Sequence, residues 1–429
     1  MTMLTVYLVL LLAIPSGVEI IALGSLGRPS LIWGIVLLGW WAVARLQMRI
    51  SDARSVFQPV RFAFVAFLVL VLVSYAVAML RGQPDDQISP AFTALIRVLS
   101  WAGVLFVAVD GIRTITDLAS MVRRIGIGAG LLAVLGLVQF LTGHGIVDFF
   151  GTIPGLSMAG GIQERAGVIR SSGTAIHPLE YATAITAALP LVIAAAISHG
   201  FRSNRAHGGL WFWLVGLISA SALVAVSRSA IIGFAVAVIS MISAVPARFR
   251  AFVIGTGTVV TVVIFAATPG LLSATIRLFS GAASDPSTQS RTRGLERIPE
   301  FMSTSPVIGS GFGLFLPRYY VFDNQWVLLA IELGVLGLLS FLAFFVAGIW
   351  SARQSRRSSD SDVRLLGHAL AASLVTVAVL FAFFDGLSFP IAGGMLFLLA
   401  GLCGSVHTVV AANVVSDAPP PGRPQGDIL

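Results

Sequence analysis

Long apolar segments recur along almost the whole chain, and they constrain its fold more than any other feature. A transmembrane helix needs about 17–25 mostly apolar residues. By that criterion the sequence predicts twelve spans, at roughly 4–23, 30–47, 60–80, 91–109, 124–142, 177–198, 210–226, 229–245, 250–268, 324–350, 363–384 and 389–411. We therefore expect an all-α integral membrane protein whose transmembrane domain covers 1–413.

The composition excludes a soluble globule of this size. The chain is 57% hydrophobic and 11% charged, with a mean hydropathy of +0.94, whereas a soluble domain carries about 25% charged residues. The net charge of +8 suits a membrane protein with basic cytoplasmic loops and does not indicate a nucleic-acid partner. All 27 basic residues are arginine, which a GC-rich genome also produces, so the positions of the arginines are more informative than their identity.

The arginines predict the orientation of the chain. If the N-terminus is cytoplasmic, most arginines of the short loops fall on the inner side, as membrane topology requires. Both termini are then cytoplasmic, and the long loops at about 143–176 and 269–323 face outward. The segment 414–429 is rich in Pro, Gly and Asp and lacks periodicity, so we expect a disordered cytoplasmic tail.

The second long loop is the most polar part of the chain. It predicts a helix over roughly 288–303, in which Arg293 and Glu296, and then Arg297 and Glu300, are spaced as i,i+3 ion pairs. One interpretation is an interfacial helix with solvated ion pairs. The other is that some of these arginines face a cavity.

A glycine-rich run and a polar cluster follow this helix. In the run 305–313, alternate glycines permit close backbone approach. Asp323 and Asn324 then open the tenth span, and Glu332 lies about 12 Å deeper. An ionisable residue inside a span normally faces the protein interior. Glu332 is therefore either a structural acid paired with an arginine, such as Arg97 or Arg228, or a catalytic group.

Two further positions carry polar groups at the ends of spans. Arg228 lies in a tight hairpin between the seventh and eighth spans, either as a snorkelling anchor or as a ligand for an anion. His177 and Glu180 share a face at the start of the sixth span, where a hydrogen-bonded cap is the commoner role. No third ligand accompanies them in the sequence, so we expect no metal.

Several motifs together resemble the O-antigen ligase and polymerase superfamily. The matching residues are Arg291, Pro306, Gly309, Gly311, Gly313, Asp323, Asn324, Glu332, Gly334 and Gly337, with the 170–178 and 227–229 segments. The resemblance implies a GT-C-like, metal-independent membrane glycosyltransferase without a cofactor. It would act on the outer side of a bacterial cytoplasmic membrane and transfer a glycan from polyprenyl (undecaprenyl) diphosphate to a glycan or lipid-linked acceptor. Ligases of the family usually carry His where this chain has Asp323.

The resemblance also implies roles for individual residues. Asp323 and Glu332 are the expected catalytic residues. The diphosphate is expected to bind Arg170, Arg228, Arg291 and Arg293, supported by Gly311, Gly313, Asn324 and His177. The alternative is a lipid-linked glycan flippase or another twelve-span secondary transporter, although transporters usually place charges near the midplane on broken helices.

Overall fold

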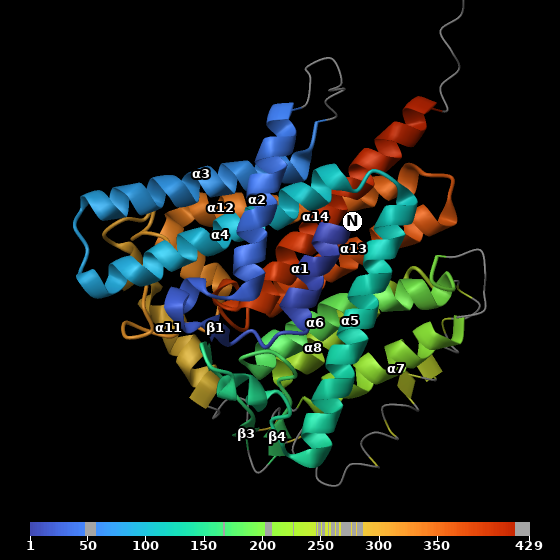
Figure 1. The fold of residues 1–429 in the computed structure, drawn as a ribbon, viewed down its shortest axis with the longest axis horizontal. Helices are drawn as coiled ribbons and strands as arrows, with labels where there is room; N and C mark the ends of the chain where they lie inside the picture. Colours follow the sequence, from blue (N-terminus) through green and yellow to red (C-terminus); the bar gives the residue numbers. More distant parts are fainter. Residues whose placement is uncertain are drawn as a thin grey trace, which may run out of the picture.

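The computed structural model describes residues 1–47, 57–165, 168–201, 208–225, 227–245 and 286–416, with isolated positions between 246 and 285. Most of these residues are helical (Figure 1). Eight helices are long and apolar enough to cross a membrane, and three shorter apolar helices accompany them within the described ranges. Only isolated positions of the predicted ninth span are described, so the total of twelve stays a prediction.

The helices follow the predicted spans closely. The long ones are α2 (Pro29–Gln47, preceded by the 3-10 helix η1 at Ile21–Leu26), α3 (Pro59–Leu80), α4 (Asp85–Gly111), α5 (Ile115–Thr142), α6 (Pro178–Ile197), α12 (Gln325–Arg353), α13 (Ser361–Leu380) and α14 (Pro390–Ser416). The shorter ones are α1 (Thr2–Leu12), α7 (Gly208–Val224) and α8 (Arg228–Ile242). Of the predicted tail, 414–416 continue α14 and the rest lies outside the described residues.

The first predicted span, at 4–23, is wrong in its length, because α1 ends at Leu12. The backbone N–H of Ser16 donates to the Thr174 carbonyl at 2.7 Å instead of continuing a helix. A Cβ on Gly17 would lie 1.9 Å from the Ala159 carbonyl oxygen, so only glycine fits where the two backbone segments meet. Pro15 cannot continue the helix, and the contact with the distant loop fixes the path of the chain beyond it.

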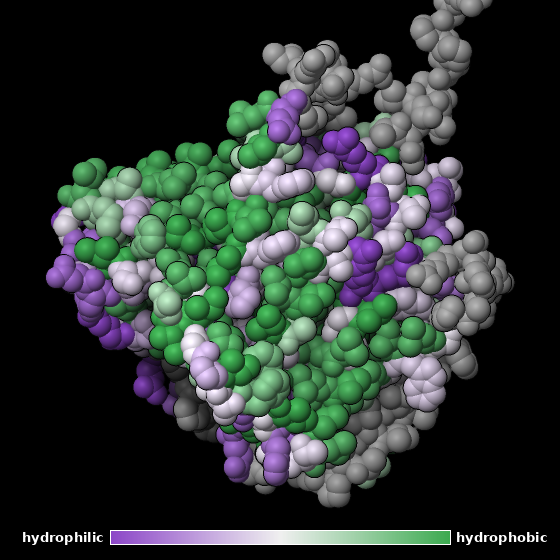
Figure 2. All heavy atoms as spheres, viewed as in Figure 1, coloured by the Kyte–Doolittle hydropathy of each residue, from purple (hydrophilic) through white to green (hydrophobic). Residues whose placement is uncertain are grey.

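The core is an aromatic cluster that joins four helices. The ring of Phe64 on α3 lies 5.7 Å from that of Phe344 on α12 and 5.4 Å from that of Phe397 on α14, and Trp101 on α4 stacks on Phe397 at 5.2 Å. The outer surface is also apolar: Figure 2 shows hydrophobic residues over most of the visible face, with hydrophilic ones gathered toward its ends. A broad exposed apolar surface of this kind suits contact with lipid.

The connections gather the polar elements at two ends. One end of the molecule carries the 143–177 and 305–324 segments, the helix α11 (Pro286–Met302) and the 381–390 connection. We call this end the loop face. Two antiparallel pairs of short strands lie in the first long loop or contact it: β1 (Val18–Ile20) with β2 (Leu156–Met158), and β3 (Gln163–Arg165) with β4 (Val168–Arg170). Figure 1 shows β1, β3, β4 and α11 on the same lower side. The turn face is the opposite end, with the 111–115 and 353–361 connections.

Candidate active site

Helix α12 is interrupted inside the apolar region, and the glycine-rich segment fills the interruption. Gly334 has φ 66° and ψ −170°, which no helix contains. Four backbone hydrogen bonds join the two segments: Ser310 N–H to Ile331 O (3.0 Å), Gly311 N–H to Glu332 O (2.9 Å), Val335 N–H to Pro306 O (2.9 Å) and Leu336 N–H to Val307 O (3.3 Å). The groups freed by the break are therefore satisfied, as a non-helical backbone at membrane depth requires.

The close approach explains the alternate glycines. A Cβ on Gly309 would lie 2.2 Å from the Glu332 carbonyl carbon, and one on Gly334 would lie 2.3 Å from that of Val307. Gly311 and Gly313 have φ of +125° and +75°, where a side chain is strained. The predicted supporting glycines are thus needed for the path of the backbone beside Glu332.

A cavity of about 420 Å³ opens at the loop face beside this segment, a size within the usual range for small-ligand sites. Its walls are α4 from Ser89, the 312–323 segment, the start of α12 and the 385–388 connection. Its charged lining residues are Asp323, Glu332, Asp385 and Arg97. The structure therefore brings the two predicted catalytic acids together, with two partners that the motif analysis did not assign to the site.

Asp323 is held by the residues that follow it. It has φ 47°, an uncommon conformation for a residue other than glycine. The Asn324 side chain caps α12 by accepting from the N–H groups of Trp326 (3.0 Å) and Val327 (3.3 Å). The side-chain oxygen of Gln325 accepts from the Leu387 N–H at 2.7 Å. Asn324 thus supports the site by fixing the helix start, and Gln325 attaches that start to the Asp385 connection.

Asp385 is the acid that sequence reasoning missed. Burial raises the pKa of Asp385, and the Asp323 charge raises it further, while a hydrogen bond from Ser388 and the charge of Arg97 act in the opposite direction. The residue stands in a short connection between two spans, where little local pattern marks it. Only its approach to Asp323 identifies it as part of the site.

Arg97 is the cation of the cavity. Its Nη1 donates to the carbonyls of Leu387 (3.2 Å) and Ser388 (3.1 Å), which attaches α4 to the same connection. Its Nε is buried and makes no hydrogen bond to any described residue. The guanidinium therefore lines the cavity with one of its donors unsatisfied. The signal in the sequence was an arginine in the middle of an apolar segment.

Among the described residues, no arginine pairs with Glu332, so the structural alternative of an ion pair is wrong. Its buried carboxylate accepts from the Phe315 N–H at 3.3 Å, and the Gly313 N–H also donates to it. The carboxylate thus holds the 313–315 segment, which forms part of the cavity wall, against α12. This arrangement assigns Glu332 a positioning role in addition to its place in the cavity lining.

Arg170 and His177 form a neighbouring group. Arg170 ends β4 and is buried, and His177 caps α6 by accepting the Leu179 N–H on Nδ1 at 3.1 Å. Burial, and then the charge of Arg170, lower the pKa of His177 to about 4. The His177 ring lies 5.8 Å from that of Phe389. The group therefore lies next to the connection that carries Asp385, although neither residue lines the cavity.

Two of the other predicted arginines, Arg228 and Arg293, also lie outside the cavity lining. Arg228 begins α8 and is half-buried, close to α6 because Ala230 packs on Ala182. Arg293 is exposed on α11 and donates to Gln289 Oε1 at 3.0 Å. The expected pair of Arg293 with Glu296 is not among the ion pairs of the described residues. The side chain of Arg291 lies outside the described residues.

Helix α11 instead contributes aromatic contacts. The expected Arg297–Glu300 pair is confirmed at 3.0 Å, and Arg297 also lies over the rings of Phe301 and Tyr320. Phe301 in turn contacts Phe322 with ring centroids 5.9 Å apart. Since Tyr320 and Phe322 line the cavity, α11 supports its wall from behind.

Long apolar helices with a charged cavity at one polar end define a multi-pass membrane protein with a site beside the membrane. No group of three His, Cys, Asp or Glu side chains is placed to hold a metal ion in the described part of the chain. Residues 213–342 match the family model of O-antigen ligase, which confirms the resemblance to the O-antigen ligase and polymerase superfamily. The match includes the helix break, Asp323 and Glu332, and it gives no support to the flippase or transporter alternative. No curated protein matches the chain.

Proposed function

We propose that the chain is a membrane glycosyltransferase of the ligase or polymerase type. It transfers a glycan from polyprenyl (undecaprenyl) diphosphate to an acceptor hydroxyl on the outer side of a bacterial inner membrane. The observation that carries the proposal is the loop-face cavity, in which Asp323, Asp385 and Arg97 meet beside the family's glycine-rich segment. The proposed transfer uses neither a metal nor a nucleotide sugar, as the resemblance implies.

The proposed reaction is a single displacement at the anomeric carbon. The acceptor oxygen forms the new glycosidic bond, its proton passes to the Asp323 carboxylate, and the bond from the sugar to the diphosphate oxygen breaks. The diphosphate leaves with the bonding electron pair, and the anomeric centre is inverted. A positioned general base contributes about 10²–10⁴-fold to such a step.

Two carboxyl groups in one cavity suit a division of roles. Because the pKa of Asp385 is raised by burial and by Asp323, we assign the proton-accepting role to Asp323 and a hydrogen-bonding role to Asp385. Environments that separate the pKa values of two neighbouring acids commonly separate their roles in this way. An asparagine at 385 should then preserve more activity than one at 323.

Cations aimed at the leaving group supply the remaining stabilisation. We add Arg97 to the proposed set of Arg170, Arg228, Arg291 and Arg293, because Arg97 is the basic residue among the described residues that line the cavity. Preorganised positive charge directed at a developing anion is worth several kcal/mol in enzymes, about 2.7–4 for one well-placed donor. Arg170, next to His177, is the second candidate.

The test uses purified full-length protein with a polyprenyl diphosphate-linked glycan and measures release of polyprenyl diphosphate without an ion gradient. We expect Asp323→Asn to lower the rate by about 10²-fold or more, with a smaller loss for Asp385→Asn. The matched control is Asp86→Asn, since Asp86 is an exposed acid of the loop face that pairs with Arg318 outside the cavity. An Asp323→Asn protein that elutes as the wild type and keeps its rate would refute the proposal.

A further inference from the structure

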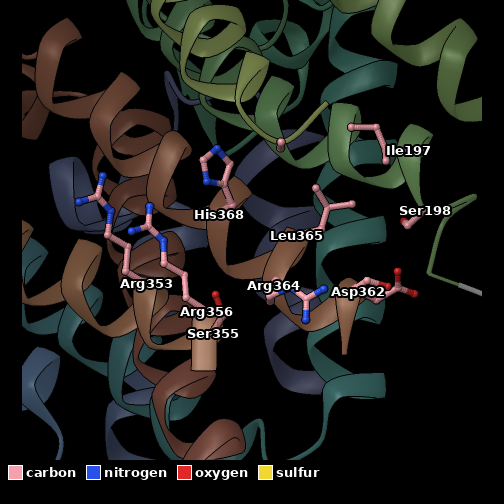
Figure 3. Close-up of a pocket in the computed structure, with 11 residues that line it drawn as sticks. Ile197, Ser198, Arg353, Ser355, Arg356, Asp362, Arg364, Leu365 and His368 are labelled. Atoms are coloured by element: carbon pink, nitrogen blue, oxygen red, sulfur yellow. The ribbon is translucent and has the colours of Figure 1, made fainter. Parts of the chain in front are cut away.

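A second cavity, of about 450 Å³, lies at the turn face, at the opposite end of the helices from the proposed active site. It is bounded by the end of α6, the residues after α8, the 3-10 helix η5 (Gln354–Arg357) and the start of α13 (Figure 3). Its basic lining residues are Arg353, Arg356, Arg364 and His368, and its acidic one is Asp362. The lining therefore has an excess of positive charge.

Two of these arginines have no polar partner in the part of the chain that the structure describes. Among the described residues, no carboxylate lies within ion-pair distance of Arg353 or Arg356, and neither guanidinium makes a hydrogen bond. On the same face, by contrast, Arg45 and Arg61 both contact Asp110, the second at 3.2 Å. A carboxylate thus offsets part of the positive charge at one place on the turn face, whereas no described carboxylate pairs with Arg353 or Arg356.

The surrounding side chains point to an anion with several acceptor oxygens. Figure 3 shows Arg353 and Arg356 extended side by side in the same direction, with His368 on that side as well. Between them in the chain is Ser355, which is 1% exposed and whose Oγ has no hydrogen-bond partner. Arg364 is held by the carbonyl of Ser359 at 2.7 Å. Forked guanidinium donors with a nearby hydroxyl suit phosphate oxygens.

The position along α12 indicates where that phosphate comes from. Leu339, Leu342, Val346 and Trp350 are 54%, 47%, 57% and 48% exposed, and their spacing of three and four places them on one lipid-facing stripe. Tryptophan is typical of the membrane interface. Arg353 continues the stripe one turn beyond Trp350, about 4.5 Å further along the axis. The cavity therefore lies at the level of lipid headgroups.

We propose that this cavity binds the phosphate headgroup of an anionic phospholipid, with an acyl chain lying along the α12 stripe. Basic pockets between membrane helices are suited to such headgroups. Soluble phosphate monoesters carry the same phosphate group, but they have no acyl chain that could contact the apolar stripe. The proposal does not depend on the reaction at the loop face.

The experiment titrates delipidated full-length protein in detergent with phosphatidylglycerol and counts bound lipid by native mass spectrometry. Arg353→Ala/Arg356→Ala should weaken one saturable site by roughly tenfold or more, since each arginine near anionic lipid contributes about 1 kcal/mol, which is about fivefold in affinity. The double variant Arg353→Gln/Arg356→Gln should lose lipid affinity to the same extent as the double alanine variant. The matched control is Arg357→Ala, an exposed residue of the same 3-10 helix that does not line the cavity, and it should stay within twofold.

Two ligand comparisons complete the test. Phosphatidylcholine, which has the same acyl chains and no net charge, should bind roughly tenfold more weakly than phosphatidylglycerol. Glycerol 3-phosphate should fail to displace the lipid at equal concentration. Unchanged binding by both double variants, or an equal loss in Arg357→Ala, would overturn the site. Displacement by glycerol 3-phosphate as effective as by the lipid itself would overturn the lipid assignment.

Discussion

Substitution of Gly309 by alanine tests the insertion of the glycine-rich segment into the α12 break. The added Cβ would lie 2.2 Å from the carbonyl carbon and oxygen of Glu332 and 2.4 Å from the backbone nitrogen of Leu333. All three atoms belong to a backbone held on both sides by helix. Because the contacting atoms are backbone and not the end of a flexible side chain, the glycine-rich segment must move away from α12 to make room for the Cβ.

The expected loss follows from two contributions. Gly309 has φ +75°, and a non-glycine residue in that region costs about 1–2 kcal/mol. The displacement also disturbs the hydrogen bonds of Ser310 and Gly311 to the carbonyls of Ile331 and Glu332, and buried groups left unpaired cost about 1–3 kcal/mol each. With partial relaxation, we expect a decrease of about 3–5 kcal/mol in the free energy of unfolding.

The assay is equilibrium unfolding in mixed detergent micelles, with two matched glycine controls. Gly155→Ala isolates the contribution of the backbone angle, because Gly155 has φ +87° and an added Cβ there would meet nothing within 4 Å, and it should cost about 1–2 kcal/mol. Gly39→Ala in α2 has open space and no positive φ, so it should be neutral or stabilising by up to about 1 kcal/mol. A Gly309→Ala protein no less stable than Gly155→Ala would refute the insertion of this segment into the break.

Three further outcomes follow from loop-face contacts. Asn324→Ala should lower stability by about 1 kcal/mol and Asn324→Asp much less, since both Asn and Asp cap helices, as measured by the same unfolding assay. Gln139→Leu should cost about 2–4 kcal/mol, because the Gln139 amide contacts both the N–H and the C=O of Gly173 at 2.7 and 2.9 Å and its loss leaves them unpaired; equal stability would contradict this. The pKa of His177 is lowered to about 4 from an ordinary value near 6.5, so the unfolded chain binds the extra proton. The contribution of neutral His177 to the free energy of unfolding should be present above about pH 6.5 and be lost toward pH 4. The His177→Asn variant keeps an acceptor for the Leu179 N–H, and its free energy of unfolding should change less with pH across that window.

The site could be predicted only in part, and its residues show why. Asp323 and Glu332 stand at a span's mouth and inside it, where polarity against an apolar background marks them. Asp385 has no such mark, because it lies in a short connection and becomes informative only when the chain brings it beside Asp323. One alternative for Glu332 was an arginine partner, yet its carboxylate accepts from backbone N–H groups of the inserted segment, which no local pattern predicts.

The sequence by itself determined the membrane class, the positions of most helices and the segment that carries the family's motifs. Apolar length and glycine spacing are local properties of the sequence, so they can be read without knowledge of distant contacts. Tertiary structure decided which segments hold the chain after α1, where α12 breaks and which charges share a cavity. Each of these depends on hydrogen bonds or charges between segments far apart in the chain, such as Ser16 with Thr174 or Arg97 with Leu387. In a membrane interior, an unpaired backbone group must find such a partner, and the folded arrangement alone settles which one it finds.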